Sequence, residues 1–236
     1  MPVQAVVFDL GETLVDESRN FTGWAEWLDV RPLDLFAALG ATIALRQDHR
    51  RAFELVRPGF DLERERAARE AGGTPWGFDA SDLYPDALPC LRDLRAAGLR
   101  IGVVGNQPAV VESMLPEVHG LADVVGSSGR WGVEKPSPAF FERVAVEVGL
   151  DPAAIAYVGD RLDNDVLPAM ALGMVGVFVV RGPWGLVQQS WTEAREATLV
   201  VDTLDGLADR LAALPASPPR PGTGSRGAPR PGAGPR

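Results

Sequence analysis

Short runs of apolar, mostly β-branched residues alternate along this chain with longer stretches in which apolar residues recur with helical periodicity. The short runs cover residues 3–8, 99–104, 124–125, 155–158 and 175–180. The helical stretches cover residues 86–97, 109–118, 138–148, 164–172 and 204–214. Short, uniformly apolar runs are typical of strands that a parallel sheet buries on both faces. The alternation predicts an α/β fold with a doubly wound parallel sheet.

The clearest single helix lies at 138–148. Ser137 stands where an N-cap is expected, Pro138 takes the first helical position and Gly149 follows the last turn. These residue types commonly begin and end helices. The apolar residues within the stretch fall on one face, which we expect to be buried.

Residues 17–83 interrupt the alternation, because they are helix-like throughout and contain no convincing strand. We therefore predict an inserted helical subdomain here, within a core formed by residues 1–16 and 84–214. The last stretch, 215–236, is dominated by Pro, Gly and Arg. Such a composition cannot bury enough apolar surface to offset chain entropy, so we expect a disordered tail.

Charge and composition exclude several classes of protein. The formal net charge is −9, and setting aside the four arginines of residues 215–236 leaves −13 on residues 1–214. A body this acidic repels nucleic-acid phosphates and anionic lipid, so we expect neither as a partner. No apolar run approaches the roughly 20 residues of a membrane span, and the N-terminus lacks a secretory pattern, so we expect a cytoplasmic protein. The single cysteine, Cys90, excludes an intrachain disulfide and is expected to fill core space.

Three of the predicted strands are followed by a polar residue suited to chemistry. Asp9, Asn106 and Asp160 each follow one of the apolar runs, the last two after a glycine. Ligands bind at the carboxyl ends of the strands in open α/β sheets, so parallel neighbours would bring these side chains to one crevice. An Asp after a strand also serves as a helix N-cap, but three such positions together favour a site.

Further acidic residues follow Asp160 in the segment Gly-Asp-Arg-Leu-Asp-Asn-Asp at 159–165. Hard oxygen ligands in this number suit Mg²⁺ rather than zinc. Carboxylates packed near Asp9 would raise one another's pKa and destabilise the fold unless a cation neutralised them. The segment therefore predicts a Mg²⁺ site, although Asp163 by itself is better explained as a residue that favours the helix dipole.

Lys135 lies in a loop just before the helix at 138–148, and it is the only lysine of the chain. A flexible ammonium at this place can offset both the Asp9 carboxylate and an incoming phosphoryl group. A solvated surface charge is the alternative. The position just ahead of the clearest helix favours a functional role.

Four segments occur in order along the chain: Phe-Asp-Leu-Gly-Glu-Thr-Leu-Val-Asp from residue 8, Val-Val-Gly-Asn from 103, Glu-Lys-Pro from 134 and Gly-Asp-Arg-Leu-Asp-Asn-Asp from 159. Each is weak alone, but together they resemble the motifs of the haloacid dehalogenase-like hydrolase superfamily over residues 3–180. The resemblance implies a Rossmann-like core, and the insertion at 17–83 resembles the helical type of cap in that family.

The resemblance also implies a role for each motif residue. Asp9 would be the nucleophile that forms an aspartyl-phosphate, and Lys135 would orient the phosphoryl group and the nucleophile. The Mg²⁺ ligands would be Asp9, Gly11 through its carbonyl, Asp160 and Asp165. The substrate phosphate would be bound by Gly105, Asn106 and Lys135.

The sequence departs from the family pattern at two positions. Gly11 stands where the phosphatases of this family usually place a second Asp as general acid and base, an effect worth about 10²–10⁴ in rate. Gly105 stands where Ser or Thr usually ends the second motif, so one hydroxyl contact to phosphate is missing. Glu12 is a candidate substitute for the acid, but consecutive residues of a turn rarely aim at one point, so we expect Glu12 to be structural or to point elsewhere.

Three functions remain open at this stage. A Mg²⁺-dependent phosphatase of a small phosphorylated metabolite, enclosed by the helical cap, explains the whole motif set. A non-catalytic phosphate-binding or partner-binding relative would explain Gly11 and Gly105, and its ligand would stabilise it without turnover. A metal-independent haloacid dehalogenase would explain Gly11 but not the acidic cluster. His49 and His119 belong to no motif, and we expect both on the surface or on helix faces. Neither the metabolite nor the oligomeric state follows from the sequence.

Overall fold

The computed structural model describes residues 2–74 and 76–215. The tail that we predict to be disordered, 215–236, lies outside the described residues except for its first residue. Among the described residues, none of the helices combines the length and the hydropathy that a membrane span requires.

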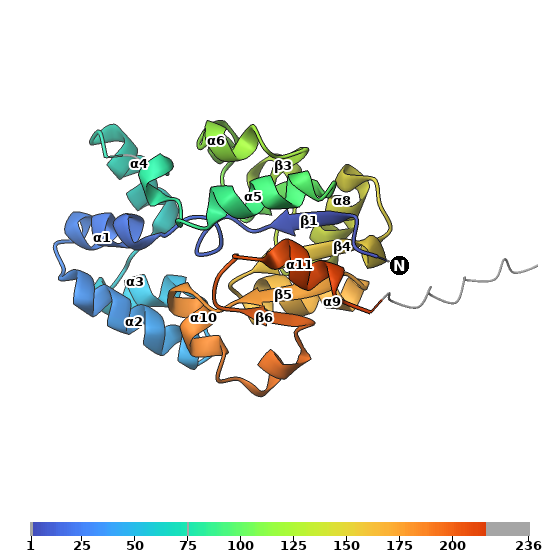
Figure 1. Ribbon diagram of the computed structural model, residues 1–236. Coiled ribbons are helices and arrows are strands. Elements are labelled where there is room, and N and C mark those ends of the chain that lie inside the picture. The colour runs from blue at the N-terminus through green and yellow to red at the C-terminus, as the bar shows by residue number, and fades with distance from the viewer. Residues whose placement is uncertain (1, 75, 216–236) are drawn as a thin grey trace, which may run out of the picture.

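One parallel sheet of six strands forms the centre of the described structure (Figure 1). The strands are β1 (Ala5–Phe8), β2 (Arg100–Gly105), β3 (Val124–Ser127), β4 (Ile155–Gly159), β5 (Val175–Val179) and β6 (Leu199–Val201). Their order is β3-β2-β1-β4-β5-β6, and every neighbouring pair is parallel. This order confirms the predicted doubly wound sheet and adds β6, which the sequence pattern did not predict. The order reverses between β1 and β4, where open sheets of this kind bind ligands.

The sheet is buried on both faces, and this explains its uniformly apolar strands. On one face Val6 and Phe8 pack with α5 (Ala87–Ala96) and α11 (Leu207–Ala212). On the other face Ala5 and Val7 pack with α8 (Pro138–Val148) and with Ala169 of α9 (Leu167–Leu172). Cys90 lies in the first of these clusters, as expected for a core residue.

Helix α8 has the predicted bounds, Pro138–Val148, and ends at Gly149 with φ 71°. Ser137 occupies the N-cap position, but its side chain accepts no capping hydrogen bond. The geometry of this helix therefore follows from Pro138, Gly149 and the buried apolar face rather than from a side-chain cap.

The predicted helix at 109–118 is wrong as a single element. The structure has a 3₁₀ helix, η2 (Ala109–Ser113), followed by the short α6 (Pro116–His119). Leu115 between them takes φ 54°, and Pro116 has no N–H to continue a helix and disfavours helical backbone before it. The predicted helix at 164–172 is α9 preceded by a π-helical turn, η4 (Leu162–Val166). The remaining short helices are α7 (Ser128–Trp131), α10 (Gly182–Gln188), η1 (Ala80–Asp82), η3 (Pro152–Ala154) and η5 (Thr192–Glu196).

Four helices lie beyond the carboxyl ends of the strands, on the left of Figure 1. They are α1 (Ser18–Trp27), α2 (Pro32–Ala44), α3 (Arg50–Val56) and α4 (Leu62–Ala71). The first three share an apolar cluster of their own, which also takes in Trp184 of α10. The helical unit is thus joined to the α/β part through α10, and the division into a core and an insertion at 17–83 stays a prediction.

A largely buried ion pair joins segments that are distant in sequence at the edge of this core. The two guanidinium nitrogens of Arg181 lie 3.0 and 2.6 Å from the carboxylate oxygens of Asp86, and one of them also donates to the Thr13 carbonyl at 3.2 Å. Asp86 in turn accepts from the Leu204 amide at 2.8 Å. The Arg181 and Asp86 side chains are only 9% and 12% exposed.

We expect Arg181→Met to lower the free energy of unfolding by about 3–5 kcal/mol, because the Asp86 carboxylate would stay buried without its cation. Urea denaturation measures this loss. The control is Arg31→Met, which breaks an exposed pair with Asp34 and should leave the free energy of unfolding almost unchanged. Equal losses in the two variants would contradict the prediction.

Candidate active site

The sheet order brings three acidic side chains to the carboxyl end of its central strands. Asp9 follows β1 and Asp160 follows the neighbouring β4, while Asp165 belongs to η4 just after Asp160. The Asp9 amide donates to the Val158 carbonyl at 2.9 Å, so the β1–β4 pairing continues into the site. One carboxylate oxygen from each of the three Asp side chains lies within 4.8 Å of the others.

Lys135 lies between two of these carboxylates. Its Nζ is 2.8 Å from Asp9 Oδ1 and 2.6 Å from Asp165 Oδ1, and its side chain is 1% exposed. Burial by itself would lower the Lys135 pKa, but the charges of Asp165 and Asp9 raise it well above its ordinary value. The side chain is therefore a buried cation held by two anions.

Asn106 positions the Lys135 loop. Its Oδ1 accepts from the Lys135 amide at 2.8 Å, and its Nδ2 donates to the Lys135 carbonyl at 2.9 Å. Because Asn106 follows β2, this pair of bonds fixes the loop to the sheet edge beside Asp9. Asn106 also lines the cavity described below, and its predicted contact with substrate phosphate stays a prediction.

The two metal-ligand candidates after β4 differ in their hydrogen bonds. Asp165 is fully buried, and its Oδ2 accepts from the Arg161 amide at 3.1 Å. Asp160 is 2% exposed, and its Oδ2 has no hydrogen-bond partner in the described part of the chain. Burial raises the pKa of Asp160 well above its ordinary value, and the charges of Asp165 and Asp9 raise it further. Burial likewise raises the Asp165 pKa to about 6, although Lys135 opposes the shift.

An unpaired carboxylate oxygen beside two other carboxylates fits a divalent cation, because such an ion satisfies oxygen atoms that nothing else partners. The donor set consists of oxygen atoms only, which suits Mg²⁺ better than zinc. Gly11, whose carbonyl is the fourth predicted ligand, lines the same cavity.

Gly105 lies directly against Asp9. A Cβ at Gly105 would lie 2.5 Å from Asp9 Oδ1, so a Ser or Thr here would require the Asp9 carboxylate to move. Gly105 is not among the residues that line the cavity. The structure thus gives this glycine a steric role toward Asp9, and its predicted backbone contact with phosphate stays a prediction.

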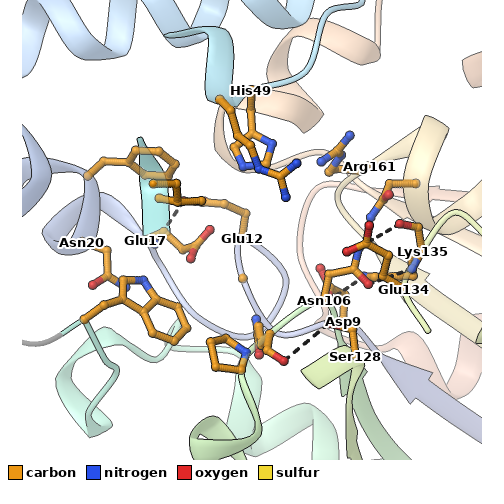
Figure 2. Close-up of a pocket in the computed structure, with 18 of the residues that line it drawn as sticks. Asp9, Glu12, Glu17, Asn20, His49, Asn106, Ser128, Glu134, Lys135 and Arg161 are labelled. Carbon is orange, nitrogen blue, oxygen red and sulfur yellow. Dashed lines mark hydrogen bonds and ion pairs between the residues drawn. The ribbon is translucent and has the colours of Figure 1, made fainter. Parts of the chain in front are cut away.

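A cavity of about 520 Å³ separates the sheet edge from the helical unit (Figure 2). At one end it is lined by Asp9, Asn106, Lys135 and Asp160. Helices α1, α3 and α4 and the residue before α3 contribute the opposite wall, with Asn20, Phe21, Trp24, His49, Arg50, Phe53, Leu62, Glu63 and Arg66. Glu17, just before α1, lines the cavity beside Gly11. A space of this size encloses a small organic ligand.

His49 is a cavity residue, which the sequence pattern did not predict. Its ring lies 5.9 Å from that of Trp184 in an edge-to-face arrangement. Burial and, to a smaller extent, the charge of Arg161 together lower the His49 pKa to about 4. His49 is therefore neutral at physiological pH and faces the cavity as an uncharged ring. No local signal in the sequence distinguishes this position from a surface histidine.

Two glutamates of the loop between β1 and α1 differ in the hydrogen bonds of their carboxyl groups. Glu12, at φ 51°, accepts from the Glu17 amide at 3.0 Å through Oε1 and from the Tyr84 hydroxyl at 2.7 Å through Oε2. Both its oxygens are thus engaged, as expected for a structural residue. Glu17 lines the cavity, and burial together with the charges of Glu12, Asp9 and Asp16 raises its pKa to about 8.

The family model described as haloacid dehalogenase-like hydrolase matches residues 3–173, a range that contains all the predicted site residues. The chain belongs to the haloacid dehalogenase-like hydrolase family. It is therefore a hydrolase whose α/β core carries Asp9 at the end of the central strand β1.

Relatives of this hydrolase include named phosphatases. Over 200 residues it is 32% identical to glyceraldehyde 3-phosphate phosphatase of Methanopyrus kandleri, a match that covers 77% of this chain and 86% of the relative. Over 233 residues it is 26% identical to phosphoglycolate phosphatase of Neisseria meningitidis, covering 89% and 94% of the two chains. The fold is also that of the HAD-hydrolase YfnB of Bacillus subtilis bound to magnesium, with TM-score 0.61, 15% identity, and coverage of 89% and 99%.

Proposed function

We propose that this hydrolase is a Mg²⁺-dependent phosphatase that releases phosphate from a small phosphorylated metabolite through an aspartyl-phosphate on Asp9. The observation that carries the proposal is the buried Lys135 ammonium between Asp9 and Asp165, next to the unpaired Asp160 oxygen at the end of a cavity of about 520 Å³. The named phosphatases among the relatives support the same reaction class.

The residues that would hold Mg²⁺ are Asp9, the Gly11 carbonyl, Asp160 and Asp165. When bound, the ion supplies positive charge that offsets the negative charge of the transferring phosphoryl group. A dehalogenase, which needs no metal, would have no use for an acidic cluster of this kind, so the cluster favours the phosphatase.

The chain's own groups account for the covalent step. A carboxylate oxygen of Asp9 forms a bond to phosphorus while the ester P–O bond breaks and its electron pair leaves with the alcohol oxygen. Lys135 holds Asp9 in place through Oδ1 and offsets charge on the phosphoryl oxygens. Water then attacks phosphorus, which breaks the bond between phosphorus and Asp9 and restores the carboxylate.

The helices α1–α4 act as a cap in this proposal. Their side chains form the wall of the cavity opposite Asp9, so they would exclude bulk water and determine which alcohol portion fits. The volume of about 520 Å³ favours phosphoesters of small metabolites over phosphorylated macromolecules.

We expect phosphate release from a panel of small phosphomonoesters to require Mg²⁺ and to fall by at least about 100-fold when EDTA removes the ion. The panel includes glyceraldehyde 3-phosphate and phosphoglycolate, and free phosphate is measured colorimetrically. No release from any ester would contradict the proposal and favour the non-catalytic binding relative. Halide release from a 2-haloacid in the presence of EDTA would instead show a dehalogenase.

A further inference from the structure

Gly11 lacks the side chain that would carry a general acid, and another carboxyl group occupies the adjacent space. A Cβ at Gly11 would lie 2.8 Å from Glu17 Oε2, 2.9 Å from Glu17 Cδ and 3.3 Å from Glu17 Oε1. Glu17 is six positions further along the chain, at the residue before α1. Its carboxyl group therefore fills the volume into which a side chain at position 11 would extend.

The backbone of Glu17 is held from two sides. Its amide donates to Glu12 Oε1 at 3.0 Å, and the other Glu12 oxygen is fixed by the Tyr84 hydroxyl at 2.7 Å. Its carbonyl accepts from the Phe21 amide at 3.0 Å at the start of α1. These hydrogen bonds position the Glu17 backbone between Glu12 and the start of α1.

The Glu17 carboxylate itself is free and faces the cavity. Within residues 2–74 and 76–215 its oxygens accept no hydrogen bond and lie in no ion pair. Figure 2 shows it projecting into the cavity between Asn20 and Asp9. The other cavity glutamates differ, because both oxygens of Glu12 are engaged, the Glu63 side chain is 84% exposed and Glu134 is also exposed.

We propose that Glu17 is the general acid and base of this reaction. The inference rests on the proposed phosphatase function. In the first step the Glu17 carboxyl group gives its proton to the departing alcohol oxygen as the P–O bond breaks and the bond between Asp9 and phosphorus forms. In the second step the Glu17 carboxylate takes a proton from the attacking water as phosphate leaves Asp9. Glu17 is then protonated again for the next substrate.

The test compares Glu17→Gln with the wild type on two esters, one with a good and one with a poor leaving group. A general acid matters most where the departing alkoxide is basic. We expect kcat/KM for glycerol phosphate to fall about 10²–10⁴-fold, whereas kcat/KM for 4-nitrophenyl phosphate falls less than about tenfold. The aryl ester should also give a burst of nitrophenol followed by slow turnover, because hydrolysis of the aspartyl-phosphate lacks its base.

The matched control is Glu26→Gln, an exposed position on α1, which should leave both esters unaffected. A second variant pair tests the shared volume directly. The double variant Glu17→Ala, Gly11→Asp supplies a carboxyl group from position 11 in place of the one lost at position 17. We expect it to hydrolyse glycerol phosphate at least about tenfold faster than Glu17→Ala alone does.

Equal loss on both esters in Glu17→Gln, or no loss on either, would overturn the role of Glu17. Absence of rescue by Gly11→Asp would also count against it. If the wild type releases phosphate from neither ester nor from any member of the wider panel, the phosphatase proposal fails and the role of Glu17 falls with it. The wild-type measurement therefore separates the two outcomes.

Discussion

Asp9→Asn is expected to lower phosphate release by at least about 10³-fold, because an amide cannot attack phosphorus and no aspartyl-phosphate can form. The substitution keeps the size of the side chain. Lys135 retains its contact with Asp165, at 2.6 Å, so the buried ammonium stays paired and the fold should persist. The readouts are the steady-state rate of phosphate release and mass spectrometry of acid-quenched enzyme, which detects the phosphorylated Asp9 peptide in the wild type alone.

The matched control is Asp163→Asn. Asp163 belongs to the same acidic segment, but its carboxylate contacts Arg161 and Gln188 and it is not among the residues that line the cavity. We expect this variant to retain activity within a few fold of the wild type. Equal phosphate release by Asp9→Asn and the wild type would rule out Asp9 as the nucleophile, and loss in both variants would point to a general effect of charge.

Lys135→Met is expected to lower both activity and stability. The activity should fall at least about 100-fold, since the phosphoryl group and Asp9 lose the buried positive charge between them. The free energy of unfolding should fall by about 3–5 kcal/mol, because Asp9 and Asp165 would remain buried without a cation. Phosphate release and urea denaturation without added metal measure the two effects.

The stability loss in Lys135→Met should depend on pH. The Asp165 pKa is raised to about 6 even with Lys135 present, and without it the pKa should rise further. When the pKa of a carboxyl group is higher in the folded than in the unfolded state, the group destabilises the fold more and more as the pH rises from the unfolded pKa to the folded pKa. The loss of unfolding free energy in Lys135→Met should therefore be larger near about pH 8 than near about pH 5. The control is Arg143→Met, which breaks an exposed pair with Glu147 and should cost less than about 1 kcal/mol at either pH. If Lys135→Met lowered the free energy of unfolding as little as the control Arg143→Met does, the prediction would be contradicted.

The strands were predictable from the sequence wherever the sheet buries them completely. Strands β1, β4 and β5 are buried along their whole length, and their apolar runs in the sequence reflect this. Strand β6 has three residues, of which only Val201 is buried, so its pattern carries too little signal. The helix predicted at 109–118 failed for a local reason, because Pro116 and the positive φ of Leu115 interrupt it.

Part of the site was predictable because strand ends have local signals. Asp9 and Asp160 follow apolar runs directly or after one glycine, and Lys135 precedes a helix with clear end signals. The direction of the other side chains could not be predicted. Whether His49 faces the solvent or the cavity depends on how α3 packs against Trp184, which comes from a distant part of the chain.

The sequence by itself determined which residues form the fully buried strands β1, β4 and β5 and which polar side chains follow β1 and β4, because burial on both faces leaves a continuous apolar run. Only the tertiary structure decided that β1 lies between β2 and β4, and hence that the three aspartates and Lys135 share one space. The tertiary structure also decided that the Glu17 carboxyl group fills the space beside Gly11. That placement depends on the turn of Glu12 and its bond to Tyr84, 72 positions away. Such long-range packing leaves no periodic pattern in the sequence.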